Sequence, residues 1–189
     1  DFTMPGWEPE RLAQLEELFA AYRPVTKEML WDNLRYFLEA IMPTCHETGI
    51  KMAIHQDDPP WDIFGLPRLL VDKASIGRLL AMVDDPYNCL CLCSGSLGAN
   101  PNNNVPDIIR TYCDRIAFAH VRNVKHYPSG DFSEVSHRDC DGDVGILEIM
   151  RAYHDCGFNG YMRPDHGRHL WGEKCRPGYG LYDRALGVM

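Results

Sequence analysis

Four residues of types that bind metal ions stand at the ends of four short apolar runs. They are His55, Cys93, His120 and Asp165. If the runs form parallel strands, their carboxyl ends lie at one edge of the sheet, and the four side chains would meet there. Imidazole, thiolate and carboxylate groups together bind a borderline divalent cation. The sequence therefore predicts a metal centre assembled from four strand ends.

Each of these residues also has a purely structural interpretation. A histidine at a strand end can be an ordinary hydrogen-bonded polar residue. Cys93 closes the run CLCLC, and buried cysteines often behave as small apolar core residues. The placement of ligand types at four equivalent positions favours the metal interpretation, because four separate coincidences would be needed otherwise.

Polar residues in the loops after these runs could receive an anionic substrate. Asp57 and Ser94 come directly after the first two runs, in HQDDPP and SGSLGAN, and Arg122 and Arg168 lie in the loops after the last two. A guanidinium group can clamp a carboxylate in a bidentate manner. SGSLGAN lacks the lysine and the spacing of a phosphate-binding P-loop. We therefore expect these four residues to contact a carboxylate substrate, although each could also be a solvated surface group.

Helical patterns and short apolar runs alternate along the chain. Apolar residues with helical spacing cover residues 8–22, 27–48, 73–83, 106–113 and 144–156, and a last helix starts at Leu181. The intervening runs of strand length cover residues 51–55, 89–93, 116–121 and 160–163. Gly49 is a candidate helix stop and Asp72 a candidate N-cap. The segments after Cys93 and after Val121 are expected to be loops.

This alternation is typical of an α/β fold with a parallel sheet covered by helices. The runs lack a regular polar and apolar alternation, which indicates that both faces of the sheet are covered. The expected architecture is one domain over residues 1–189, with a helical segment at 8–48 followed by four strand–loop–helix units.

Composition argues against several classes of protein. The 27 acidic and 19 basic residues give a net charge of −8, which disfavours nucleic acids and anionic membranes as partners. No apolar stretch approaches the roughly 20 residues that span a bilayer, and the opening DFTMPGWEPE does not have the pattern of a signal peptide. The eight cysteines form no CxxC motif, which disfavours a structural zinc site. We expect mostly buried, free thiols in a reducing cytoplasm.

Longer motifs around the same residues resemble those of mannonate dehydratases. The motifs are IHQDDPPWDIFGLPR, CSGSLGANP, FAHVRNVK and RPDHGRHLWGEKCRPGYGLYDRALG. The resemblance extends from about Trp31 to the end, with Gln56 where the family usually has proline and Ser94 where it usually has threonine. It implies a xylose-isomerase-like TIM barrel. It also implies dehydration of D-mannonate to 2-dehydro-3-deoxy-D-gluconate in hexuronate catabolism.

The resemblance further implies one divalent ion, Mn²⁺ or Fe²⁺, held by the same four strand-end residues. It assigns proton transfer to His166 and Tyr179, with the roles of acid and base left open. Zn²⁺ would bind such a ligand set more tightly than Mn²⁺ by the usual affinity order, so the identity of the ion stays open.

Four strands are half of the eight that close a TIM barrel. We therefore expect the C-terminal half of such a barrel, in a chain that is either a fragment or completes itself by association, most simply as a homo-oligomer. Two other functions fit the same residues. One is a metal-dependent sugar isomerase or epimerase of the same superfamily, which would release no water. The other is an inactive remnant that acts as an oligomerisation module.

Overall fold

The computed structural model describes residues 9–167, 169–174 and 180–188 as an α/β structure. Its strands are β1 (Met52–His55), β2 (Asn88–Cys93), β3 (Ile116–Val121), β4 (Asn123–His126), β5 (Phe132–Val135) and β6 (Tyr161–Pro164). Its α-helices are α1 (Pro9–Tyr22), α2 (Lys27–Thr48), α3 (Lys73–Met82), α4 (Ser94–Gly98), α5 (Val105–Tyr112), α6 (Ile146–Asp155) and α7 (Leu181–Val188). Short 3₁₀ turns η1 (Cys113–Arg115) and η2 (Asp139–Asp141) complete the description.

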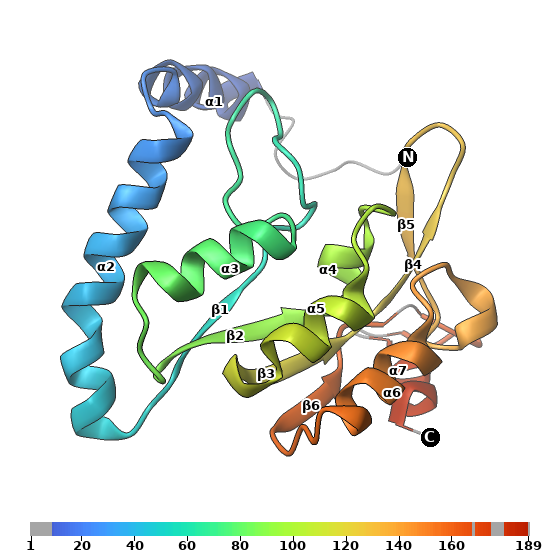
Figure 1. The fold of residues 1–189 in the computed structure, drawn as a ribbon. Coiled ribbons are helices and arrows are strands. Elements are labelled where there is room, and N and C mark those ends of the chain that lie inside the picture. Colours follow the sequence, from blue (N-terminus) through green and yellow to red (C-terminus); the bar gives the residue numbers. More distant parts are fainter. Residues whose placement is uncertain (1–8, 168, 175–179, 189) are drawn as a thin grey trace.

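Four parallel strands form the main sheet, in the order β1-β2-β3-β6. They are the four strands that the sequence predicts, and helices α3, α5 and α6 lie along one face of them (Figure 1). β1 leads through a loop into α3, β2 continues directly into α4, and β3 is followed by the hairpin strands β4 and β5 before α6. Alternation of parallel strands with helices is the repeating pattern of a (β/α) barrel. Within the described ranges the sheet remains open, with β1 and β6 at its edges.

Burial differs between the central and the outer strands. All six residues of β2 are buried, whereas β1 and β6 consist of half-buried and exposed residues. The prediction that both faces are covered is therefore correct for β2 and wrong for the two edge strands. The difference arises because β2 has neighbours on both sides and helices over it, while an edge strand lacks a partner on one side.

Local chemistry explains where the helices begin and end. At the start of α3, the Asp72 carboxylate accepts the backbone N–H of Ser75, and the Ser75 hydroxyl accepts the backbone N–H of Asp72. This reciprocal pair is a capping box, so the predicted N-cap is confirmed. Gly49 ends α2 in the left-handed conformation at φ 70°, which is the predicted stop.

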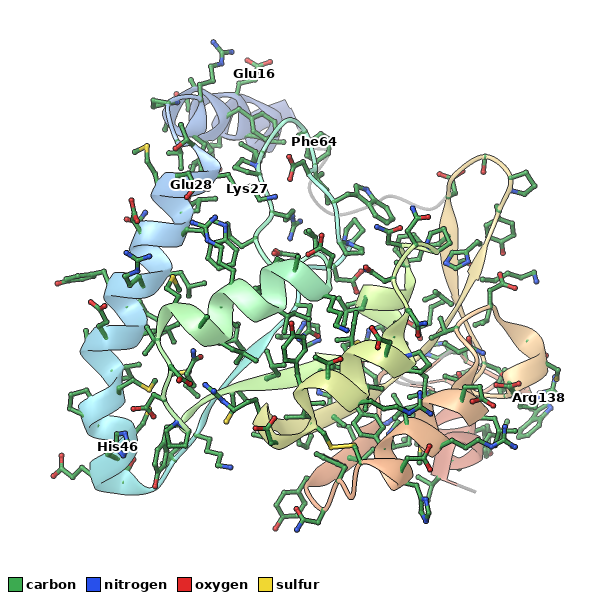
Figure 2. The ribbon with its side chains drawn as sticks, viewed as in Figure 1. Glu16, Lys27, Glu28, His46, Phe64 and Arg138 are labelled. Carbon is green, nitrogen blue, oxygen red and sulfur yellow. A yellow bond between two sulfur atoms is a disulfide. The ribbon has the colours of Figure 1, made fainter. Side chains whose placement is uncertain are left out.

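Helix α2 forms as predicted but buries a slightly different face. Trp31 and Leu38 are buried, while Phe37, which the spacing places on the apolar face, is 46% exposed. The helix stands along one side of the molecule (Figure 1), so only a narrow stripe of it meets the core. His46 lies near the C-terminal end of α2 (Figure 2), and its Nε2 is 2.7 Å from Asp85 Oδ2. No helix in the described part of the chain is both long and apolar enough to cross a bilayer.

The segment after β3 is a hairpin and not the loop that the sequence predicts. Strands β4 and β5 pair in antiparallel fashion, and the hairpin stands out from the main sheet beside α4 (Figure 1). The turn between them closes with a bond from the Gly130 N–H to the Tyr127 carbonyl, and Gly130 has φ 88°. Each strand has only four residues, too few to show a clear period along the sequence. Helix α4 likewise replaces part of a predicted loop.

Cysteine behaviour matches the sequence-based expectation only in part. Cys45, Cys89, Cys91 and Cys93 are free and buried, and Cys140 is free and exposed. Cys113 and Cys156, however, form a disulfide, visible as a yellow bond in Figure 2, so the expectation of free thiols is wrong for this pair. The two cysteines are 43 residues apart in sequence, and they meet because α5 packs against α6.

Candidate metal centre

Three of the four predicted ligands meet at the carboxyl ends of neighbouring strands. His55 ends β1, Cys93 ends β2, and His120 is the penultimate residue of β3. Parallel pairing sets Cys93 directly beside His120. One ligand atom from each residue lies within 4.8 Å of the other two. Strand register thus produces a compact cluster of two imidazoles and one sulfur.

Asp165, directly after β6, brings a carboxylate to the same cluster. Its Oδ2 lies 3.8 Å from the Cys93 sulfur and its Oδ1 lies 3.5 Å from His120 Nδ1. Burial raises the pKa of Asp165, but electrostatic interactions with His120 and His166 and a hydrogen bond from Arg163 outweigh burial, and the pKa is lowered. The carboxylate is therefore ionised at neutral pH and able to act as a ligand.

Cys93 is the cysteine of the CLCLC run whose thiol ionises most easily. Burial raises its pKa, but hydrogen bonds from the His120 and His55 rings outweigh burial and bring the pKa to about 6. Burial raises the pKa of Cys91 to about 11, and it also raises the pKa of Cys89. Because the thiolate is the form that binds metals, the three cysteines separate into one candidate ligand and two core residues.

The hydrogen bonds of the two histidine rings indicate which ring nitrogens could bind a metal ion. His55 Nδ1 lies 2.6 Å from the backbone carbonyl of Gln56, so Nδ1 carries a proton and Nε2 is the ring nitrogen left for a metal ion. His120 Nδ1 is buried and has no hydrogen-bond partner, which is unusual for a buried nitrogen unless it serves a ligand. The donor set of two imidazoles, a thiolate and a carboxylate fits a borderline divalent cation.

Gln56 links the ends of the two strands that carry His55 and Cys93. Its side-chain Oε1 accepts the backbone N–H of Cys93 at 2.9 Å, and the residue is 3% exposed. Proline, the usual residue of the family at this position, has no side-chain acceptor and could not make this bond. The departure from the motif therefore adds a direct tie between the ends of β1 and β2.

Arg122 places a buried positive charge beside the cluster. It is 6% exposed, and its Nη2 donates to Asp58 Oδ2 at 2.5 Å. Its Nη1 donates to His166 Nε2 at 3.1 Å. The guanidinium thus joins the loop after β1 to the loop after β6, next to the four candidate ligands.

The turn after β2 fixes where Arg122 lies. The Ser94 hydroxyl accepts the backbone N–H of Arg122 and donates to its carbonyl, at 2.9 and 2.8 Å. Gly95 leaves space for the guanidinium stem, because a Cβ there would lie 2.8 Å from the Arg122 Cβ and Cγ and closer still to Nε. Ser94 is fully buried, and both of these bonds are to the backbone of Arg122. Its role in this structure is therefore to hold the Arg122 backbone in place.

We predict that Gly95→Ala destabilises the protein by about 1–3 kcal/mol, the usual cost of overpacking a filled site. The extra methyl group must displace Arg122 from its position between Asp58 and His166. Urea unfolding of the parent and the variant measures the loss. Equal stability of parent and Gly95→Ala would contradict the proposed close packing.

Asp57 and Asp58 have different surroundings although they are neighbours in sequence. Asp57 accepts the backbone N–H groups of Leu69 and Leu70 and pairs with Arg68, so its carboxylate braces the loop that it opens. Asp58 is the carboxylate that reaches Arg122 and also accepts from the Ser96 hydroxyl at 3.3 Å. Sequence reasoning singled out Asp57, and only the folded loop distinguishes the two.

His166 lies at the edge of the cluster, with Nε2 3.6 Å from Asp165 Oδ2. Its Nδ1 is 2.5 Å from Glu134 Oε2 on β5. This hydrogen bond to Glu134 raises the pKa of His166, while the charge of Arg122 acts to lower it. The sequence analysis did not identify Glu134 as a site residue. The residues Pro-Ser-Gly at 128–130 are typical of a turn and could have predicted the hairpin that carries it. Arg168 and Tyr179 lie outside the described residues.

Comparison with known families gives a match over the whole chain. The family model described as D-mannonate dehydratase (UxuA) matches residues 1–189. A protein named mannonate dehydratase 1 from Bacillus licheniformis is 65% identical over 189 residues, and a mannonate dehydratase from Bacillus subtilis is 58% identical over 189 residues. These alignments cover 100% of this chain but 52% and 53% of the relatives. The chain thus spans about half the length of the curated relatives it matches.

A solved structure agrees with the fold. The crystal structure of mannonate dehydratase from Streptococcus suis serotype 2 superimposes with a TM-score of 0.88 at 39% sequence identity. The superposition covers 97% of this chain and 53% of that chain. The open sheet and its helices therefore correspond to about half of that protein.

Proposed function

Since the chain belongs to the D-mannonate dehydratase family, we propose that it serves the dehydration of D-mannonate to 2-dehydro-3-deoxy-D-gluconate. The observation that carries this proposal is the convergence of His55, Cys93, His120 and Asp165 at the strand ends. They would hold one divalent ion, Mn²⁺ or Fe²⁺, although Zn²⁺ also suits the ligand set. A divalent ion there would supply Lewis-acid stabilisation of negative charge on the substrate.

The reaction removes a proton from C2 of the sugar acid and expels the C3 hydroxyl group as water. Loss of the C2 proton beside a carboxylate develops a second negative charge, so the site must supply positive charge and a positioned base. Arg122 presents its buried guanidinium beside the cluster, and we assign it, together with Arg168, to the substrate carboxylate. Ser94 and Asp57 take supporting parts, because they brace Arg122 and the loop after β1.

We propose His166 and Tyr179 as the pair that moves protons. His166 holds Nε2 at the edge of the cluster, 3.6 Å from Asp165, where a proton can pass between the ring and a bound sugar acid. Tyrosine is a weak base because its ordinary pKa is near 10, so Tyr179 requires nearby positive charge if it is to accept a proton. Each of the two residues serves one of the two transfers.

We further propose that the active form is a homo-oligomer in the cytoplasm, with a role in hexuronate catabolism. The open edges at β1 and β6 support association, because unpaired strand edges are normally covered in folded proteins. Tyr161 on β6 is 82% exposed and would be available for such a contact. The five free thiols in the described part of the chain fit a reducing location, and the pair Cys113 and Cys156 is the exception.

The proposal predicts turnover of D-mannonate by the purified protein supplied with Mn²⁺. The 2-keto-3-deoxy acid should accumulate as one molecule of water is lost from each molecule of substrate. An isomerase or epimerase would instead give a product of unchanged mass, which mass spectrometry distinguishes. Mass measurement of the protein in solution accompanies the assay. An inactive monomer would favour the alternative of a silent oligomerisation module over the enzyme.

A further inference from the structure

The hairpin β4–β5 turns one face toward the metal centre. Phe132 and Glu134 are two residues apart on β5 and therefore share a face. Phe132 packs edge-on against Trp61 at 5.6 Å between ring centroids, and Glu134 reaches His166. The Trp61 contact joins this face to the loop after β1, so the hairpin is held over the carboxyl ends of the strands.

The base of the hairpin is tied down independently of Glu134. The Asn123 side chain donates to the carbonyls of Ser136 and Arg138 at 3.1 and 2.9 Å. The His126 ring lies 2.8 Å from the Gly98 carbonyl. These bonds connect the hairpin to η2 and to the end of α4. These bonds hold the hairpin, and with it Glu134 on β5, in a fixed position near the metal centre.

The contacts of the His166 ring determine where its proton lies. An arginine guanidinium has only donors, so Nε2 must accept the bond from Arg122 Nη1 at 3.1 Å. The remaining ring proton is then on Nδ1, which lies 2.5 Å from Glu134 Oε2. Two side chains, Arg122 and Glu134, thus agree on one tautomer of the neutral His166 ring. That tautomer directs the lone pair of Nε2 toward Arg122, beside the metal centre.

We propose that Glu134 is a positioning residue that holds His166 in the Nδ1–H tautomer and so keeps Nε2, which Arg122 contacts beside the metal centre, as the acceptor nitrogen for the substrate. The catalytic role of His166 in this inference rests on the proposed function. The tautomer itself depends only on the contacts of the His166 ring with Glu134 and Arg122. A carboxylate that fixes the tautomer of a histidine is a recurrent device, because the second nitrogen is then oriented and available.

The first test locates the proton directly. Nitrogen-15 NMR of the histidine rings, recorded at pH 9 on the protein with Zn²⁺ as a diamagnetic ion, should show His166 protonated at Nδ1 alone. A proton on Nε2, in either the neutral or the doubly protonated ring, would overturn the proposal. Since this measurement needs no substrate, it remains decisive even if D-mannonate is not turned over.

The second test uses variants of the hairpin. Glu134→Ala should abolish the single-tautomer pattern and lower kcat by about 10–100-fold, the range typical of lost outer-sphere support, with KM changed less than threefold. Glu134→Gln keeps an acceptor oxygen of the same reach and should restore the tautomer and most of kcat. Ser133→Ala is the control, because Ser133 bonds to Tyr127 in the same hairpin and does not touch His166.

A merely structural role for Glu134 makes different predictions. The Glu134→Ala and Ser133→Ala variants would then lose similar amounts of activity and stability, and the His166 ring pattern would stay as in the parent. That result would overturn the proposal. Should Glu134→Ala fail to fold, the comparison of parent with Glu134→Gln decides, because loss of the Nδ1–H tautomer in the glutamine variant would equally contradict it.

Discussion

Cys93→Ala should lose the bound divalent ion, while Cys91→Ala should keep it. The two cysteines lie two residues apart on β2 and are both buried. The pKa of the Cys93 thiol is about 6 and that of Cys91 is about 11, so at neutral pH only Cys93 is a thiolate. We expect the affinity for Mn²⁺ to fall by more than ~100-fold in Cys93→Ala, beyond the range for lost outer-sphere contacts.

Equilibrium dialysis followed by elemental analysis measures the metal content of the two variants and the parent. Thermal unfolding of the metal-free proteins is the control, since both substitutions remove a similar buried volume and should cost similar stability. Stoichiometric metal in Cys93→Ala would exclude Cys93 as a ligand. Equal loss in both variants would instead indicate general damage to β2.

His166→Asn should reduce the dehydration rate by about 10²–10⁴-fold, the usual contribution of a positioned acid or base. Asparagine is close in size to the imidazole but cannot carry a proton between groups at neutral pH. The metal content should remain stoichiometric, because the four candidate ligands are unchanged. Comparison of kcat and metal content in the same preparation separates loss of chemistry from loss of the ion.

His154→Asn is the matched control for this substitution. His154 lies on α6 with a side chain that is 91% exposed, and its replacement should leave kcat within twofold of the parent. Dehydration by His166→Asn within a few-fold of the parent rate would remove His166 from the reaction. Metal loss in that variant would instead assign the residue a part in holding the ion.

The strand ends of the site could be predicted from the sequence because they depend on topology alone. Four apolar runs separated by helical patterns define a parallel sheet, and its carboxyl ends must face the same way. His55, Cys93, His120 and Asp165 follow from that one premise. Asp72 and Gly49 likewise mark helix ends through local hydrogen bonding and backbone conformation, which need no tertiary contact.

Tertiary packing decided the features that the sequence left open. Phe37 has helical spacing equal to that of its neighbours, yet it is exposed because α2 meets the core along a narrow stripe. Asp57 and Asp58 differ only in how the loop folds. Glu134 lies on a four-residue strand, where periodicity carries little information. The pairing of Cys113 with Cys156 depends on the packing of α5 against α6.

The fixed position of the Arg122 side chain affects the entropy cost of binding an anion. A free arginine side chain loses rotamer entropy of about 0.5–1.5 kcal/mol when a ligand immobilises it. Here Ser94 clamps the backbone of Arg122 on both its amide and its carbonyl, and its side chain is packed against Gly95. Folding has already restricted these torsions, so a substrate carboxylate bound by Arg122 as proposed would cost less side-chain entropy than one bound by a free arginine.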